Sequence, residues 1–282
     1  MRWRCPVCSD DLALAEGGAV CRQGHQFDRA RQGYINLLPA NHKASRDPGD
    51  SSEMINARQR FLGAGYYQPL ALAMSDMLDE QTSDLAAVRL LDCGCGEGYY
   101  THQFAKTLAS KRRFSKPDSN GLSPVQVAGV DISRMALRVA SRQYPALAFV
   151  VASNFHVPVQ ASEVDVMTRI FAPGDSLEVR RVLAPQGKLL VVYPGPRHLF
   201  ELKADIYSVP REHASPPVPE GFVCIEERRL QFPLLLSEPD LIKALLDMTP
   251  FTWSRRHDAE TLLPHQLATQ ADFVLRCYQV SL

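Results

Sequence analysis

The chain has 282 residues, 45% of them hydrophobic and 8% aromatic, a composition that suits a large folded domain with a small one beside it. Basic and acidic residues number 31 each, so net charge gives no overall sign of a polyanionic partner. No apolar run approaches the ~18 residues of a membrane-spanning helix, which excludes a membrane span. The N-terminus has no apolar leader before Cys5, so we expect a cytoplasmic protein with reduced cysteines.

The first residues have the ligand spacing of a zinc site. A C-x2-C pair on a tight turn supplies two thiolates, and a cysteine and a histidine four residues apart complete a tetrahedral set. Buried free thiols or a disulfide are the alternatives, but the odd count of seven cysteines favours metal ligands in a reducing compartment. Residues 1–39 form a module too small for its own core, which zinc would hold together. The predicted ligands are Cys5, Cys8, Cys21 and His25.

Residues 40–87 read as a linker and a helical lead-in to a larger domain. The polar stretch 40–50 predicts a loop. Ser51 or Ser52 can cap a helix that runs through Met54 and Leu62, and a second helical pattern covers about 69–85.

From residue 88 to 282, strands and helices alternate, which predicts right-handed βαβ units, a parallel sheet and an α/β Rossmann-like fold. The predicted strands cover 88–93, 125–130, 149–152, 164–170 and 188–193, and the predicted helices begin at 99, 133 and 177. Near the C-terminus, 222–230 and 273–280 read as strands around a helix at 240–248, and a reversed strand at the edge of a parallel sheet would explain them.

A glycine-rich loop between the first strand and its helix predicts a cofactor site, because glycine permits positive φ and close approach of a ligand. The dinucleotide fingerprint fails at Tyr99, where a third glycine is required, and no G-K-S/T phosphate loop is present. Acidic residues in the loop would repel a pyrophosphate but suit S-adenosylmethionine, which has an amino acid head and a sulfonium. The predicted contacts are Asp92, Gly94, Gly96, Glu97 and Gly98.

Asp131 ends the second strand, where an acidic residue would hold the ribose hydroxyls. It lies 37 residues after Gly94, and 23 once the predicted 14-residue insertion at 111–124 is left out, close to the usual spacing of about 20. After the third strand, the Asn154 amide and the Phe155 ring are candidates for the adenine. An ordinary polar loop is the alternative for that pair.

Several motifs together are similar to one family over nearly the whole chain. They are C-P-V-C…C-R-Q-G-H-Q-F-D, G-Y-I-N-L-L-P, H-K-A-S-R-D-P-G-D, L-D-C-G-C-G-E-G-Y-Y-T, P-G-P-R-H-L-F-E-L-K and M-T-P-F-T-W. The chain resembles the bacterial 23S ribosomal RNA (guanine-N1)-methyltransferases of the macrolide-resistance type. The resemblance implies that the four N-terminal residues hold zinc and that Tyr67, Gly96, Glu97 and His198 contact the cofactor. The 111–124 insertion and the Ser153-Asn154-Phe155-His156 loop depart from the expected pattern, which leaves the adenine contacts and the target guanine open.

The resemblance further implies a class I methyltransferase domain that methylates N1 of a guanine in a 23S ribosomal RNA hairpin, with a homodimer left open. We expect the zinc module to bind the RNA hairpin, because it carries an excess of basic residues and its size suits recognition better than catalysis. Residues 1–46 carry seven basic and four acidic side chains, and 102–117 carry five basic and no acidic ones. Such patches fit phosphate contacts, although a solvated charged surface is an equal alternative. A methyltransferase of small molecules or proteins and a non-catalytic zinc RNA-binding protein are the competing functions.

The loop after the fourth strand, Phe171-Ala172-Pro173-Gly174, is expected to face the methyl group. Phe171 could stack on an extruded base or be an ordinary core phenylalanine. The nearest polar candidates for catalysis are Asp175, Arg197 and His198, and the sequence assigns no general base among them.

Overall fold

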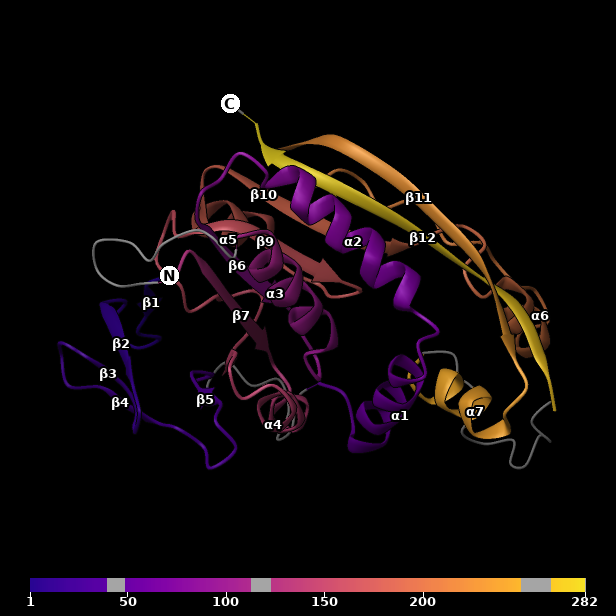
Figure 1. Ribbon diagram of the computed structural model, residues 1–282, viewed down its shortest axis with the longest axis horizontal. Coiled ribbons are helices and arrows are strands. Elements are labelled where there is room, and N and C mark those ends of the chain that lie inside the picture. The colour runs from indigo at the N-terminus through magenta and orange to yellow at the C-terminus, as the bar shows by residue number, and fades with distance from the viewer. Residues whose placement is uncertain (40–48, 113–122, 250–264, 282) are drawn as a thin grey trace.

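The computed structural model describes residues 1–39, 49–112, 123–249 and 265–281, which form a small and a large β-sheet with helices on the large one (Figure 1). Most of the predicted linker loop at 40–50 and of the insertion at 111–124, and the end of the M-T-P-F-T-W motif, lie outside the described residues. Among the described helices, none is both long and apolar enough to cross a membrane.

The N-terminal module is a four-stranded antiparallel sheet with the order β1-β2-β3-β4. Its strands are β1 (Trp3–Arg4), β2 (Asp11–Ala15), β3 (Gly18–Cys21) and β4 (Gln26–Asp28). The strands are short and leave little room for a core, as expected for a module held by a metal. We refer to this module as the zinc ribbon.

The large sheet has eight strands in the order β11-β12-β10-β9-β6-β7-β8-β5. The predicted parallel strands are present as β6 (Val88–Cys93), β7 (Val125–Asp131), β8 (Ala148–Val151), β9 (Val164–Ile170) and β10 (Leu183–Pro194). They pair in parallel with their neighbours, which confirms the βαβ alternation that the sequence predicts. The carboxyl ends of these strands therefore share one edge of the sheet, where an open α/β fold binds its ligands.

The helices begin where the sequence places polar caps. Ser51 and Ser133 each accept a hydrogen bond from a backbone N–H three residues on, and Asp175 does the same for α5. The predicted second helix ends at Gln81 rather than near residue 85, and the short α6 was not predicted. The helices are α1 (Ser52–Gly63), α2 (Gln68–Gln81), α3 (Tyr99–Lys111), α4 (Arg134–Gln143), α5 (Ser176–Val182), α6 (Phe200–Ile206) and α7 (Pro239–Asp247).

The predicted reversed strand is present at the edge of the parallel strands, and one further strand lies outside it. β12 (Leu267–Val280) is the reversed strand, but it lies between β10 and β11 (Phe222–Leu236) and is antiparallel to both. Most side chains of β12 are buried, whereas the middle of β11 alternates exposed and partly buried residues. A strand covered on both faces belongs inside a sheet, and a strand with charged residues such as Glu227 and Arg229 suits an edge.

The zinc ribbon is joined to the large sheet rather than tethered to it. β5 (Ile35–Asn36) adds a parallel strand beside β8, and Trp3 forms an antiparallel bridge with Val159. Trp3 belongs to a hydrophobic cluster with Val150 of β8 and with Val159 in the segment after β8, and the Arg2 guanidinium pairs with the Glu163 carboxylate at 2.7 Å. The ribbon therefore packs directly against the β8 side of the large sheet.

Candidate functional site

The four predicted zinc ligands converge in the zinc ribbon. One ligand atom from each of Cys5, Cys8, Cys21 and His25 lies within 4.8 Å of the other three. Cys8 Sγ is 3.7 Å from Cys21 Sγ, and His25 Nδ1 is 3.7 Å from Cys5 Sγ and 3.3 Å from Cys21 Sγ. Zinc bonds of about 2.3 Å to sulfur and 2.0 Å to nitrogen give tetrahedron edges of about 3.5–3.8 Å, so the cluster fits zinc.

Glycine is required in the predicted cofactor loop, which runs from the end of β6 to the start of α3. Gly94, Gly96 and Gly98 have φ values of +76°, +55° and +84°. A Cβ added to Gly94 would lie 2.3 Å from the Cβ of Ala172, so a larger residue would displace the loop after β9. The loop therefore brings bare backbone against the strand ends.

Asp92 is buried beneath this loop, with 2% of its surface exposed. Its two carboxylate oxygens accept hydrogen bonds from the Thr101 hydroxyl at 2.6 Å and from the Thr168 hydroxyl at 2.8 Å. Burial raises the pKa of Asp92 to about 6, and the two hydroxyl donors oppose that rise. Asp92 thus links β6, β9 and α3 and fixes the base of the loop.

Asp131 lies at the end of β7 beside the loop, as the corrected spacing predicts. Its Oδ2 accepts a hydrogen bond from the Gly96 N–H at 2.9 Å, and its Oδ1 accepts one from the Ser133 N–H at 2.8 Å. Burial raises the pKa of this carboxyl, while the two backbone donors lower it. Each oxygen keeps a further lone pair that a ligand hydroxyl can use.

Glu97 is buried within the loop and faces a cation that the sequence did not single out. The Arg58 guanidinium of α1 lies 3.6 Å from Glu97 Oε2 and also pairs with Asp50. Burial raises the pKa of Glu97, and Arg58 opposes the rise. Glu97 Oε2 nevertheless has no hydrogen-bond donor within the described chain. Asp50 belongs to the D-P-G-D motif, and this motif is the sequence feature that could have pointed to the contact between Asp50 and Arg58.

A cavity of about 390 Å³, which we call the first cavity, collects most of the predicted cofactor residues. Two of its polar atoms, Glu97 Oε2 and Asn154 Oδ1, are buried without a hydrogen-bond partner among the described residues, as is the Tyr100 hydroxyl, although the Arg58 guanidinium lies 3.6 Å from Glu97 Oε2. Buried polar groups are normally satisfied, so these atoms indicate a polar ligand and fit S-adenosylmethionine. The predicted residues that line the first cavity are Asp92, Gly94, Gly96, Glu97, Asp131, Asn154 and Phe155, whereas Gly98 caps α3.

Tyr67 and His198 line a different, adjoining cavity of about 630 Å³, the second cavity. Their side chains meet there, with the Tyr67 hydroxyl 3.5 Å from His198 Nε2. The two cavities share five lining residues: Asp50, Arg58, Phe171, Ala172 and Pro173. The second cavity is rich in aromatic side chains. The first cavity is polar, the second is aromatic, and the two adjoin each other.

Phe171 lies at the junction of the two cavities. Its side chain is 47% exposed, so the reading of Phe171 as an ordinary core phenylalanine is wrong. Its backbone has φ +55°, a conformation rare for a large side chain and often found at functional sites. The centroid of its ring lies 6.3 Å from that of the His198 ring, with an angle of 25° between the ring planes. Because Phe171 is partly exposed, its ring can stack on a flat ligand.

The P-G-P-R-H motif wraps around the fully buried carboxylate of Asp272 on β12. That carboxylate accepts hydrogen bonds from the Arg197 N–H and the Arg229 guanidinium, each at 2.9 Å. A Cβ on Gly195 would lie 2.4 Å from the same carboxylate, so the tight turn needs glycine. The Asp272 N–H in turn donates to His198 Nδ1 at 3.3 Å. Asp272 therefore orients His198 toward the second cavity.

Of the three polar candidates near the expected methyl position, His198 lines the second cavity, whereas Asp175 and Arg197 line neither the first cavity nor the second. Asp175 caps α5, and the Arg197 guanidinium lies over the Phe200 ring at 4.4 Å. Burial, followed by the neighbouring His213, lowers the pKa of His198 to about 3. His198 is consequently neutral at physiological pH.

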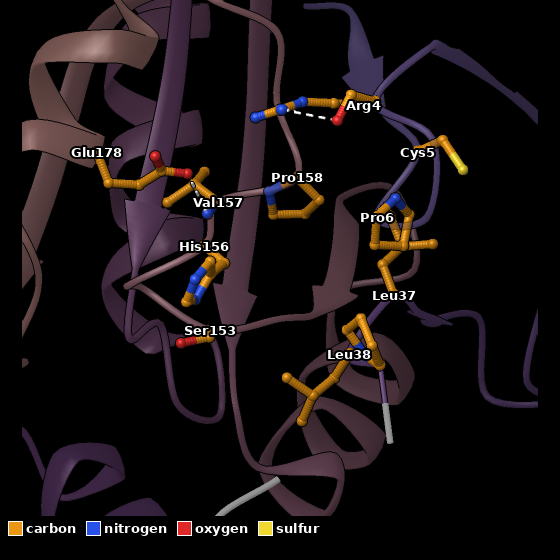
Figure 2. A pocket seen from close by; sticks show the side chains of 12 residues that line it. Arg4, Cys5, Pro6, Leu37, Leu38, Ser153, His156, Val157, Pro158 and Glu178 are labelled. Carbon is orange, nitrogen blue, oxygen red and sulfur yellow. Dashed lines mark hydrogen bonds between the residues drawn. The ribbon is translucent and has the colours of Figure 1, made fainter. Parts of the chain in front are cut away.

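A third cavity of about 160 Å³ lies between the zinc ribbon and the large sheet (Figure 2). Arg4 and Pro6 border it from the ribbon, and His156 and Pro158 border it from the segment after β8. Ser153 lines both this cavity and the first one. The ribbon thus stands directly beside the candidate cofactor site.

Arg22, Arg29 and Arg31 of the zinc ribbon are all exposed, but the guanidinium of Arg29 is held by the ribbon backbone. The Arg29 guanidinium donates to three backbone carbonyl oxygens of the ribbon, those of Ala15, Glu16 and Gly33. The positive surface available to a partner is therefore smaller than the sequence count of basic residues indicates.

Comparisons with known proteins agree with the division of the chain into a small N-terminal module and a large α/β domain. Residues 3–46 match a zinc-ribbon family model described as RlmA, N-terminal, and residues 84–245 match a methyltransferase domain. The 23S rRNA (guanine(748)-N(1))-methyltransferase of Streptomyces fradiae is 30% identical over 261 residues, which cover 90% of this chain and 87% of that protein.

Two further relatives carry the same activity in their names, on a provisional basis. YxjB of Bacillus subtilis (strain 168) is 30% identical over 270 residues, which cover 93% of this chain and 90% of YxjB. A Micromonospora griseorubida protein is 36% identical over 209 residues, which cover 71% of this chain and 68% of the relative.

Proposed function

This chain belongs to the family of the 23S rRNA (guanine-N1)-methyltransferases, and we propose that it methylates N1 of a guanine in a hairpin loop of 23S ribosomal RNA. It is an S-adenosylmethionine-dependent methyltransferase with a zinc ribbon. The observation that carries the proposal is the pair of adjoining cavities, one polar and one aromatic, that meet at Phe171.

In this proposal the first cavity holds S-adenosylmethionine, whose sulfonium supplies an electrophilic methyl group. Asp131 accepts hydrogen bonds from the ribose hydroxyls, and the backbone around Gly96 and Glu97 receives the methionine end. Asn154 and Phe155 lie on the remaining side of the cavity, where an amide and an exposed ring suit the adenine. Supporting this assignment, Glu97 Oε2 and Asn154 Oδ1 have no hydrogen-bond donor among the described residues, and a bound ligand can supply one.

The remaining predicted cofactor residues have other places in the same proposal. Tyr67 and His198 lie in the second cavity, so they reach the bound cofactor only at its methyl-bearing end. Asp92 acts through its two threonine partners and keeps the loop in shape. Gly98 allows α3 to begin directly after the loop, with φ +84°.

The second cavity takes the guanine, which must leave its base stack to reach the methyl group. Phe171 is exposed at the mouth shared by both cavities and is suited to stack on the base. The zinc ribbon binds the RNA hairpin beside this entrance, where its exposed arginines can reach phosphates. Methyl transfer is an in-line displacement, so most of the catalysis is the positioning of these two partners.

Methylation of a small molecule or a protein is the alternative, and it lacks a matching observation. The family relationship extends through the ribbon as well as the catalytic domain, and a small substrate has no need of the ribbon. A non-catalytic RNA-binding role is disfavoured because the cofactor loop is fully formed. Its three glycines have positive φ, and the buried Asp92 and Asp131 carboxylates accept hydrogen bonds that hold it in place.

Primer extension on 23S ribosomal RNA tests the proposal. The protein is incubated with S-adenosylmethionine and RNA that lacks the modification. An N1 methyl group blocks Watson–Crick pairing, so reverse transcriptase should stop immediately before one guanine. RNA incubated without the cofactor is the control. If labelled methyl groups enter a metabolite pool or a protein and no stop appears on the RNA, the proposal is wrong.

A further inference from the structure

His213 is a cavity residue that no sequence motif indicated. It lies in the segment after α6, lines the second cavity and donates its backbone N–H to the Pro196 carbonyl oxygen at 3.1 Å. Its side chain brings Nε2 into a buried position without a hydrogen-bond partner among the described residues. The His213 ring centroid is 6.2 Å from that of His198. Two imidazoles therefore line the second cavity, and Nε2 of His213 makes no hydrogen bond to a described residue.

Methylation at N1 of guanine poses a specific proton problem. Neutral guanine carries a proton on N1, and that proton must leave for N1 to use its electron pair. As it leaves, electron density builds on O6, the neighbouring atom of the same base edge. A base beside N1 and a donor beside O6 would therefore both lower the barrier.

His198 is arranged as a donor rather than as a base. Its Nδ1 accepts the Asp272 N–H, so the proton of the neutral ring is on Nε2, which faces the second cavity beside Tyr67. An Nε2–H can donate to O6 but cannot remove a proton. Asp50, the carboxylate that lines the same cavity, is paired with Arg58. His213 Nε2 is the ring nitrogen left for the base.

Resting on the function proposed above, we propose that His213 is the general base that removes the N1 proton while His198 donates to O6. The N1–H bond breaks and its proton moves to His213 Nε2. The N1 electron pair forms the new bond to the methyl carbon. The carbon–sulfur bond breaks, and its pair stays on sulfur, which loses its positive charge. The protonated His213 then returns its proton to solvent.

The surroundings of His213 keep it in the required neutral form. Burial, followed by Lys203 of α6, lowers the pKa of His213, and Asp272 of β12 opposes them. The other titratable ring that faces it is His198, which is itself neutral. A base must be unprotonated, so the methylation rate should fall only as pH drops through this lowered pKa.

Single-turnover methylation of 23S ribosomal RNA by the full-length protein tests the assignment across a range of pH. His213→Ala and His213→Gln should lose about 10²- to 10⁴-fold in rate near neutral pH, the usual contribution of general base catalysis. The loss should shrink as pH rises, because guanine N1 then loses its proton to solvent. Affinity for S-adenosylmethionine, measured by calorimetry, should stay unchanged. His265→Ala, at an exposed histidine, is the matched control.

Two outcomes would overturn the assignment while leaving the proposed function intact. The first is a variant that methylates the same guanine at the parent rate. The second is a loss that is equal at every pH, which would indicate a purely structural role for His213. A parent protein that stops primer extension at no guanine would instead refute the proposed function, and the base assignment with it. Recovery of His213→Gly by free imidazole would support the assignment independently of how the substitution affects packing.

Discussion

The zinc ribbon and the cofactor loop both hold a short turn of backbone in a fixed shape, but they do so by different means. In the ribbon, four side chains meet at one point that fits a metal ion. In the loop, Asp92 and Asp131 receive separate hydrogen bonds from side chains and backbone, above a large apolar sheet. Loss of one ligand should therefore unfold the whole zinc ribbon, because its fold depends on a single metal ion. Loss of one contact in the cofactor loop should only reduce cofactor affinity, because the other contacts still hold the loop.

The largest expected effect is the loss of a zinc ligand. Cys8→Ser should remove zinc and unfold the ribbon, because structural zinc contributes on the order of 10–16 kcal/mol to a module of this kind. Metal analysis and limited proteolysis measure the two effects. Cys224→Ser, at an exposed cysteine outside the cluster, is the control and should retain zinc. A Cys8→Ser protein that keeps both its zinc and its protease resistance would contradict the comparison.

The same variant also measures how far the ribbon supports the catalytic domain. Leu38, just after β5, packs in one cluster with Cys95 of the cofactor loop, and Trp3 packs against the sheet. We therefore expect the affinity for S-adenosylmethionine to fall modestly when the ribbon unfolds. If calorimetry finds the affinity unchanged, the two regions are energetically independent despite their contact.

An intermediate effect is expected at Asp131. Asp131→Ala should weaken cofactor binding about 10- to 100-fold, since a hydrogen bond to a charged group contributes about 1.5–3 kcal/mol. Asp131→Asn keeps the shape and one acceptor, so it should retain more affinity. The pKa of Asp131 is raised by burial and the ionised form is the better acceptor, so affinity should fall as pH drops through that raised pKa. Equal affinities for parent and Asp131→Ala in calorimetry would refute the ribose assignment.

The smallest effect concerns RNA contacts of the ribbon. Arg22→Glu combined with Arg31→Glu should weaken RNA binding roughly tenfold and lower the slope of log affinity against log salt by about 2. Arg29 is left intact because its guanidinium holds the ribbon backbone, and its replacement would disturb the fold. Lys243→Glu on α7, at the far end of the molecule from the ribbon, is the control (Figure 1). An unaltered salt slope would show that these arginines do not contact phosphates.

Local patterns in the sequence were sufficient for several parts of the structure. The spacing of Cys5, Cys8, Cys21 and His25 predicted a converging ligand set, because each pair needs only one tight turn. The glycine-rich loop and Asp131 were predicted to meet, because parallel strands bring their carboxyl ends to one edge. Strand and helix alternation after residue 88 likewise depends on periodicity, which is visible in a single chain.

Other features of the structure depended on which segments, far apart in the sequence, pack against one another. β12 lies inside the sheet because its residues are covered on both faces, a fact that appears only once β10 and β11 flank it. Phe171 and His198 share a cavity only because the loops after β9 and β10 face each other. By itself, therefore, the sequence determined the convergence of Cys5, Cys8, Cys21 and His25, the glycine-rich loop beside Asp131 and the class of fold, which arise from short-range spacing. The tertiary structure alone decided the joining of ribbon and sheet and the placement of His213, because long-range packing sets which side chains meet.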